Sequence, residues 1–291
     1  MGISKHFSVV TMPRTEKPYH SILSFLTDRF PAISGEKWER RISEGRVLDD
    51  ARNRVTHKTA YAPQKRIFYL REVAEEPLIP FAEKIIFHDD EILVACKPHF
   101  LPVTPGGRYV DECLLNRLRR STGVEELAPL HRIDRETAGI VLFSVNKKSR
   151  GVYGRLFMTG QVEKTYQAIS ASLPTLETAS WVVENRIERG EPWFRMKIVP
   201  GRINARSIIN LVGIKDGMAH FTLHPLTGKT HQLRLHLGWI GFGILNDRYY
   251  PELQPESADN FDTPLQLIAR SVRFRDPLSG RECEFVSERE L

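Results

Sequence analysis

Long hydrophobic runs are missing from the sequence. No apolar stretch approaches the roughly 18 to 20 residues that span a bilayer, and runs such as 92–96 and 140–143 have only the length of a strand. The first residues, 1–12, lack the apolar centre and the small-residue cleavage site of a signal peptide. We therefore expect a protein with no membrane partner.

Cysteine is also scarce. The chain has three cysteines, Cys96, Cys113 and Cys283, which are odd in number and widely spaced. They form no disulfide framework and match no zinc pattern. A reducing compartment, the cytoplasm, is the expected location.

The composition is otherwise that of a globular protein. The 291 residues are 41% hydrophobic and 27% charged, and this length predicts about two domains. The 42 Lys and Arg against 36 Asp and Glu give a net charge of +6. Residues 1–76 hold 14 basic against 10 acidic residues, a local charge of +4. This basic excess suggests a polyanion partner, although many soluble proteins with a similar balance do not bind nucleic acid.

The N-terminal segment, 1–76, reads as a small helical unit followed by short strands. Apolar residues recur at helical spacing over 19–26. Ser34 is placed to cap a helix over 35–44, which Gly45 would end. Strands are predicted at 47–48 and 66–73. Two prolines and a charge cluster at 75–80 mark a linker, so the second domain is expected to cover 77–291.

The remainder of the chain is mostly β in pattern. A helix is expected over 147–161, and the turn at 215–217 predicts a hairpin. Strands that follow one another with few helices indicate an α+β fold with a mainly antiparallel sheet. The predicted strands are 91–96, 139–145, 164–170, 181–187, 194–199, 207–212, 218–224 and 267–274.

A dense polar cluster, 131–139, directly precedes one of these strands. Asp134 stands between Arg132 and Arg135 in it, and neighbouring cations favour the ionised carboxylate. Such a carboxylate can act as a nucleophile or a base. A solvated loop with surface ion pairs explains the same residues, and the spacing alone favours that explanation.

Two further clusters carry polar residues. Tyr166 begins a strand, where a tyrosine is more often a packing residue. In 227–237, Gly228-Lys229-Thr230 is no phosphate loop, because Leu223 stands where that motif needs glycine. Arg234 lies in a leucine-rich stretch, so its charge needs a partner. The nearby histidines match no metal-ligand pattern; they are His220, His224, His231 and His236.

Taken together, the clusters resemble the RluA-type family of pseudouridine synthases. The family pattern H-R-L-D-R-x-T-S-G resembles 131–139, K-x-Y-x-A resembles 164–168, and G-R-T-H-Q-I-R-V-H resembles 228–236. The resemblance covers about residues 80 to 285. The later family segment H-P-I-x-G-D-x-x-Y-G is weaker here, at 242–251, which puts subfamily and substrate in question more than activity.

The resemblance implies a mixed, mainly antiparallel sheet with a central RNA-binding cleft. It implies isomerisation of specific uridines in structured RNA, ribosomal or transfer RNA, with no metal or organic cofactor. Asp134 would be the catalytic aspartate, Tyr166 the active-site tyrosine, and Arg234 the basic residue that pairs with the aspartate. The residues it assigns to substrate binding are Arg132, which would fill the space left by the flipped uridine, His131, Thr137 and the apolar Leu267.

The N-terminal segment resembles an S4-type RNA-binding module at 23–26, at Ser34 and at 42–47. The module would contact phosphates through a basic face; its residues are Lys37, Arg40, Arg41 and Arg46. A structural helical cap with a solvated face is the alternative. We expect a monomer that binds RNA and not DNA.

Two other functions compete with the synthase. A non-catalytic RNA-binding or ribosome-assembly factor could keep the same fold, although pure binding does not need Asp134, Tyr166 and Arg234 together. A metal-dependent hydrolase could be built on the histidines, and its activity would depend on the metal.

Overall fold

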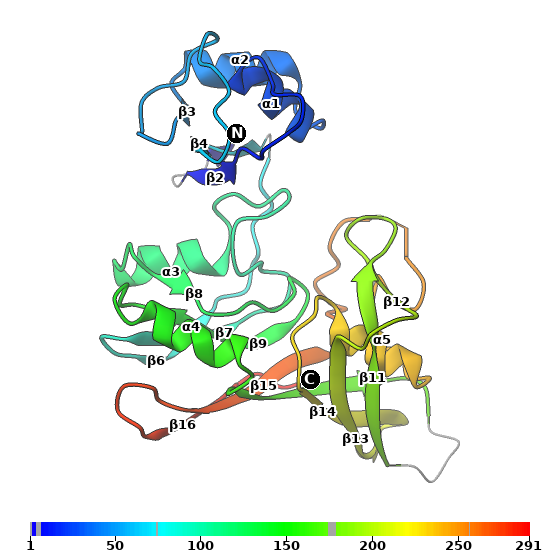
Figure 1. Cartoon of the computed structure of the whole chain (residues 1–291). Coiled ribbons are helices and arrows are strands. Elements are labelled where there is room, and N and C mark those ends of the chain that lie inside the picture. The colour runs from blue at the N-terminus through cyan, green and yellow to red at the C-terminus, as the bar shows by residue number, and fades with distance from the viewer. Residues whose placement is uncertain (1, 4–6, 74, 174–178, 256) are drawn as a thin grey trace. The chain divides into compact units, whose positions relative to one another are not determined.

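The computed structural model describes residues 2–3, 7–73, 75–173, 179–255 and 257–291. The chain folds into two compact units, both drawn in Figure 1. The first comprises Met1–Pro77 with Gly106–Asp111, and the second comprises Leu78–Pro105 with Glu112–Leu291. Residues 106–111 join the first unit partly because the amides of Val110 and Asp111 donate to the Glu76 carboxylate, a long-range contact that no local pattern predicts.

In the described part of the first unit there are two helices, a three-stranded sheet and a separate two-stranded sheet. The buried side chains of Phe25 and Leu26 form one core with Trp38 and Ile42. The strand order is β2–β4–β3, with β1 paired to β5. The elements are β1 (Gly2–Ile3), β2 (Ser8–Thr11), α1 (Ile22–Arg29), α2 (Gly35–Ser43), β3 (Val47–Leu48), β4 (Arg66–Tyr69) and β5 (Glu72–Val73).

The ends of α2 follow the sequence prediction. The Ser34 hydroxyl accepts a hydrogen bond from the Lys37 amide at 3.3 Å, which satisfies one of the free amides of the first turn. Gly45 follows the helix with φ of +70°, a conformation that glycine adopts without a Cβ penalty. Local signals were therefore sufficient here.

One carboxylate organises the basic residues of this unit. The Glu72 side chain, 3% exposed, lies 3.3 Å from Arg41 Nε and 2.7 Å from Arg46 Nη1. Arg40 and Lys37 approach it at 3.3 Å and 3.8 Å. Arg41 is 2% exposed and lies against the Trp38 ring, so its predicted contact with RNA is wrong. Charge spacing on a helix does not reveal an internal acid that comes from 31 residues away.

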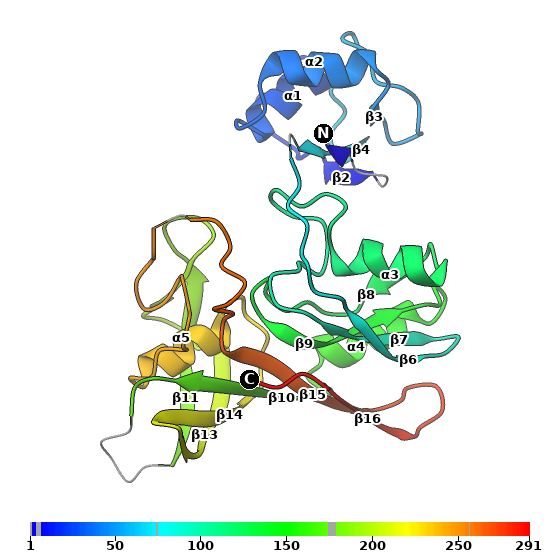
Figure 2. The same cartoon turned by 180° about the vertical axis from the view of Figure 1, so that it is seen from behind.

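The second unit is built on an eleven-stranded sheet. Its strand order is β12–β11–β13–β14–β10–β15–β9–β7–β6, with β16 paired to β15 and β8 to β9, and Figure 2 shows it from behind. The described strands pair antiparallel except for β15 with β9. They are β6 (Lys84–His88), β7 (Ile92–Lys97), β8 (Ala128–Pro129), β9 (Ala138–Ser144), β10 (Glu163–Ser170), β11 (Ser180–Arg189), β12 (Met196–Val199), β13 (Ala205–Lys215), β14 (Met218–Pro225), β15 (Leu267–Arg275) and β16 (Glu282–Val286).

This architecture confirms the predicted α+β class with a mainly antiparallel sheet. The predicted hairpin is confirmed as well: Asp216 and Gly217, both with positive φ, connect β13 to β14. These are the backbone angles that a two-residue hairpin turn requires.

In the described part of the chain, three helices belong to the second unit, and only one was predicted. α4 (Arg150–Met158) falls inside the predicted 147–161, whereas α3 (Leu114–Thr122) and α5 (Gln232–Trp239) were not foreseen. α5 is buried on nearly all sides, through residues such as Leu233, Arg234 and Leu237, so it shows no amphipathic period. None of the helices in the described ranges has the length and apolarity to cross a membrane.

The parallel pair β9–β15 depends on a glycine. Gly139 has φ of +112° and pairs with Ala269. A Cβ at Gly139 would overlap the backbone carbonyl of Ala269, and backbone cannot move aside as a flexible side chain can. β15 contributes to two hydrophobic cores, Leu267 to one and Val272 to the other.

Replacing Gly139 with alanine should weaken the junction. We expect Gly139→Ala to lower stability by about 3 kcal/mol, because both the backbone angle and the contact with Ala269 become strained. In a unit of this size that corresponds to about 10 °C in Tm. The control is Gly151→Ala in α4, where nothing lies near the added Cβ and a small gain is expected. Equal melting temperatures for the two variants would contradict this account.

Loss of the Glu72 carboxylate should destabilise the first unit. Glu72→Ala leaves Arg41 buried without its partner, which typically lowers stability by about 3 to 5 kcal/mol. Burial raises the pKa of Glu72, but Arg41 and the other cations outweigh it, and the pKa is lowered. The stabilisation is therefore present above the unfolded pKa of about 4.3 and is lost as the pH falls through the lower folded value.

Native-state hydrogen exchange of the α2 amides measures this loss. Glu39→Ala, a change at an exposed acid on the same helix, is the control and should leave the protection unchanged. Full protection in Glu72→Ala would show that the four cations do not depend on this carboxylate.

Candidate active site

A cleft of about 1000 Å³ opens in the second unit. Its walls come from the loop before β9, the end of α4, the start of β10, the end of β14 and the start of α5. The structure brings to this one cleft all seven residues predicted from the sequence motifs of the second domain. They are His131, Arg132, Asp134, Thr137, Tyr166, Arg234 and Leu267.

Asp134 lies in a fixed turn at the start of β9. The Thr137 amide donates to the Asp134 carbonyl at 3.2 Å. The fully buried ammonium of Lys97 donates to the carbonyl of the next residue, Arg135, and also to those of Pro98 and Leu101. Burial lowers the pKa of Lys97 to about 7, and the three carbonyl acceptors favour its charged form. The Asp134 side chain keeps 22% exposure, so a rigid loop presents an accessible carboxylate.

Arg234 is the cation that faces Asp134, but Asp134 is not its main partner. Its Nε and Nη2 donate to Asp247 in a bidentate pair at 2.8 and 2.5 Å, whereas Nη1 lies 3.6 Å from Asp134 Oδ2. The predicted ion pair of Arg234 with Asp134 is therefore present, and Asp247 is a second, nearer partner of the guanidinium. Burial opposes the charge of Arg234, but the hydrogen bond and the charge of Asp247, together with the charges of Asp134 and Glu136, outweigh it and raise the pKa. Arg234 thus stays charged, and Nη1, which has no hydrogen-bond partner among the described residues, points to the site.

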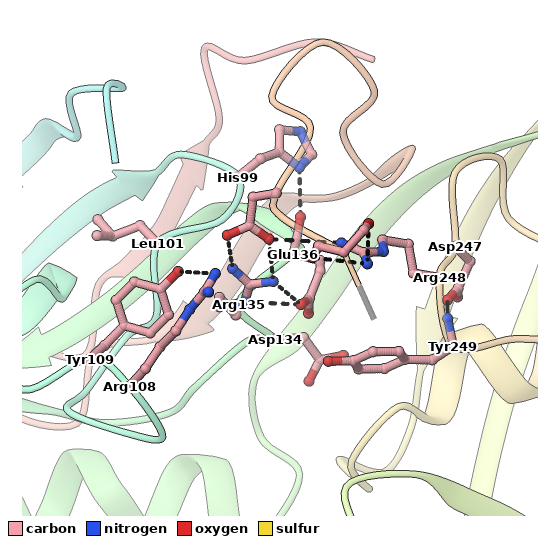
Figure 3. Close-up of polar contacts among 12 residues, drawn as sticks. His99, Leu101, Arg108, Tyr109, Asp134, Arg135, Glu136, Asp247, Arg248 and Tyr249 are labelled. Carbon is pink, nitrogen blue, oxygen red and sulfur yellow. Dashed lines mark hydrogen bonds and ion pairs between the residues drawn. The ribbon is translucent and has the colours of Figure 1, made fainter. Parts of the chain in front are cut away.

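The two arginines that flank Asp134 in the sequence, Arg132 and Arg135, differ in their surroundings. Arg135 forms a bidentate pair with Asp259 at 2.8 and 3.0 Å. It also binds Glu136, as Figure 3 shows. Arg132 is exposed and lines the cleft. The loop thus turns Arg135 toward residue 259, which is distant in sequence.

Tyr166 and Leu267 give the cleft an apolar side. Tyr166 on β10 pairs with Leu223 of β14 and with Ala269 of β15, in the middle of the sheet. Burial, and then the nearby charge of Asp134, raise the pKa of Tyr166, so the phenol keeps its proton at neutral pH. Leu267 is 3% exposed. A ring and an alkyl side chain thus face the space beside the carboxylate.

His131 and Thr137 lie in the wall of the cleft. His131 stacks on Phe157 with ring centres 4.6 Å apart, and its Nε2 accepts the Leu142 amide at 3.1 Å. Burial, and then Lys164, lower the pKa of His131 to about 3, so the ring is neutral and positions the loop. Thr137 is 2% exposed, and its hydroxyl has no hydrogen-bond partner within the described part of the chain.

Sequence reasoning missed His231, which also faces Asp134. His231 precedes α5 with φ of +54°; its Nδ1 lies 2.9 Å from the Tyr250 hydroxyl and its Nε2 lies 3.9 Å from Asp134 Oδ2. The Tyr250 hydroxyl donates its one proton to the Met196 carbonyl at 3.1 Å, so Nδ1 of His231 is the donor to Tyr250. Sequence reasoning also missed Asp247, which lies in 242–251, the segment that matches the family pattern more weakly. The aspartate of that pattern is retained at this position, and it was the signal that could have identified Asp247.

The other histidines do not form a metal site. His236 binds Asn185 at 3.1 Å, and His224 lies 3.5 Å from Thr165. Within the ranges that the structure describes, no three His, Cys, Asp or Glu side chains come together as metal ligands. The histidines of this segment therefore give the hydrolase hypothesis no support.

Comparisons with known proteins agree with this fold and site. The model of the RNA pseudouridylate synthase family matches residues 91–239. The dual-specificity RNA pseudouridine synthase RluA of Haemophilus influenzae is 30% identical over 72% of this chain and 94% of its own length. The mitochondrial tRNA pseudouridine(32) synthase of Saccharomyces cerevisiae is 30% identical over 60% of this chain, which spans 38% of that enzyme.

A solved structure supports the same conclusion. Human RNA pseudouridylate synthase domain containing 4 is 26% identical, with a TM-score of 0.54 over 69% of this chain and 87% of that one. The chain belongs to the RNA pseudouridylate synthase family. It is an RNA pseudouridine synthase, an isomerase that converts uridine in RNA to pseudouridine.

Removing the partner of Arg234 should destabilise the site. Asp247→Ala leaves a guanidinium that is 1% exposed without its bidentate acceptor, and such a change lowers stability by about 3 to 5 kcal/mol. Thermal unfolding measures the effect, with Asp262→Ala, at an exposed acid in a loop, as the control. A Tm of Asp247→Ala equal to that of the control would mean that Asp134 and Glu136, the other acids near the guanidinium, are enough to hold Arg234.

Proposed function

We propose that Asp134 is the catalytic carboxylate of this synthase, and that Tyr166 and Arg234 act with it. The observation that carries the proposal is the arrangement of the acids around the Arg234 guanidinium. Two of its nitrogens are held by Asp247, and the third faces Asp134 at 3.6 Å. Asp134 thus faces a positive charge without being enclosed by a bidentate pair, so its oxygens stay available to a substrate.

The reaction explains why these groups are needed together. The N1–C1′ bond of uridine breaks and a C5–C1′ bond forms on the same base. The base must leave any stack to be reached, and the detached uracil must rotate without escaping. Tyr166 and Leu267 offer faces against which the ring can lie. An anionic Asp134 can attack C1′, add to C6 or remove a ribose proton, and all three routes start from the same ionised carboxylate.

The remaining predicted residues are proposed to hold the RNA. Arg132 lines the cleft and is exposed, which suits insertion into the space that the flipped uridine leaves. Lys164 and Lys229 also line the cleft and can meet phosphates. His131 and Thr137 shape the wall, with the Thr137 hydroxyl as a hydrogen-bonding group.

The first unit, residues 1–76 in the sequence prediction, is proposed to be an S4-like RNA-binding module. Lys37, Arg40 and Arg46 surround Glu72 with at least a quarter of each side chain exposed. These three cations and the buried Arg41 exceed the single charge of Glu72. The net positive charge supports phosphate binding by the module.

The substrate is proposed to be structured ribosomal or transfer RNA. The names of two relatives support these RNA classes as substrates. The yeast relative is a tRNA pseudouridine synthase, and the Haemophilus relative is a dual-specificity RNA pseudouridine synthase. We also propose that the enzyme acts as a monomer in the cytoplasm, without DNA or membrane as partner. Its three cysteines are free thiols, in keeping with a reducing compartment.

Release of tritium from RNA labelled at uridine C5 tests the catalytic assignment. Formation of the C5–C1′ bond expels that hydrogen, so the target position need not be known. We expect wild type to release tritium from unmodified ribosomal or transfer RNA, and Asp134→Asn to reduce the rate by at least 10³-fold, about 4 kcal/mol. Folding and RNA affinity should stay near wild type, because the change removes a charge and keeps the shape.

Asp216→Asn is the matched control, since it makes the same change at the exposed β13–β14 turn. It should release tritium at the wild-type rate. Near-normal release by Asp134→Asn would overturn the assignment of the carboxylate.

A further inference from the structure

An exposed aromatic pair lies at the connection between β11 and β12 (Figure 1). Trp193 is 73% exposed and Phe194 is 36% exposed. Their rings meet edge to face with centres 5.9 Å apart. A large aromatic side chain this open to solvent is uncommon in a folded domain, and nothing in the mechanism above uses it.

The pair is connected to the active site by a continuous line of ring contacts. The Phe194 ring centre lies 5.3 Å from that of Tyr249, and the Arg234 guanidinium lies 4.8 Å from the centre of the same Tyr249 ring. Tyr249 also meets His231 at 5.7 Å. The exposed rings are thus the outer end of the cluster that surrounds the groups facing Asp134.

The backbone of this connection is well ordered by its own hydrogen bonds. The Gly190 amide donates to the Arg195 carbonyl and the Arg195 amide to the Pro192 carbonyl, each at 2.8 Å. The Arg195 guanidinium lies 5.0 Å from the Tyr250 ring and donates to the Pro251 carbonyl. The aromatic pair is therefore presented in a fixed place, which lowers the entropy lost when a ligand stacks on it.

The charge around the pair suits an anionic ligand. Residues 186–202 contain five basic and two acidic side chains, and Arg186 and Glu188 among them pair with each other. The basic ones are Arg186, Arg189, Arg195, Lys197 and Arg202, and the acidic ones are Glu188 and Glu191. Aromatic faces beside a basic strand pair are the combination that binds unpaired nucleotides, because bases stack on the rings and phosphates meet the cations.

We propose that Trp193 and Phe194 form a stacking platform for an unpaired RNA base near the target uridine. The platform rests on the synthase activity, since it needs the substrate to be RNA in which bases beside the target are unpaired. An aromatic face accepts any base, so the platform adds affinity for open RNA without choosing a sequence. It holds the strand beside the cleft while Asp134 acts on the target.

Binding of a twelve-nucleotide oligouridylate tests the proposal. We expect Trp193→Ala to raise the Kd about 10-fold, the effect of losing one base–aromatic stack. Trp193→Phe keeps an aromatic face and should restore most of the affinity. A fully paired RNA duplex offers no free base, so its Kd should be the same for wild type and Trp193→Ala.

Trp239→Ala is the matched control. Trp239 is 65% exposed at the end of α5, and the neighbouring Phe242 packs on Trp181 near the opposite end of β11. Its removal should leave the oligouridylate Kd unchanged. An unchanged oligouridylate Kd in Trp193→Ala would overturn the platform and make the pair a surface for another kind of partner. An equal loss of oligouridylate affinity in Trp193→Ala and Trp239→Ala would also overturn it.

The two proposals fail in different measurements. Loss of the platform changes the Kd of the oligouridylate and does not depend on Asp134. Tritium release that persists in Asp134→Asn would remove the catalytic assignment, whatever the Kd of Trp193→Ala.

Discussion

The guanidinium of Arg234 is almost completely removed from water, and a buried charge is tolerated only beside an opposite charge with good geometry. Asp247 supplies it, with the pair nearly inaccessible on both sides. Because Asp247 occupies two of the nitrogens, the third can face Asp134 without enclosing it. A direct bidentate pair between Arg234 and Asp134 would have satisfied both charges and left no free carboxylate oxygen. The geometry of the site therefore depends on Asp247, which is not among the residues that line the cleft.

This arrangement of Asp134 and Arg234 requires segments from distant parts of the chain to be held in fixed positions next to one another. Asp134 stands in the loop before β9, Arg234 on α5 and Tyr166 on β10. β15 joins them, since it pairs with β10 on one side and with the first residues of β9 on the other. Gly139 permits the close parallel approach, and Lys97 ties the loop to the end of β7 through backbone carbonyls. The position of the carboxylate is thus determined by backbone contacts on both sides of its loop.

Local patterns were enough to predict much of this molecule. Strand periodicity located β7, β9, β10, β13 and β14, and turn chemistry located the hairpin at Asp216 and Gly217. The motifs located the cleft residues, because their spacing in the family reflects one fold. Partners could not be predicted. Asp247, Asp259 and Glu72 each bind an arginine far away in sequence, and α5 is buried nearly all round, so it has no polar face that would reveal its period.

The Arg234–Asp247 pair is inaccessible to the ions of the solution, and the Lys97 ammonium is held by carbonyl dipoles inside the protein. Dissolved salt screens such interactions far less than it screens phosphates against exposed lysine and arginine. Ionic strength therefore acts on capture of the RNA and leaves the catalytic geometry as it is.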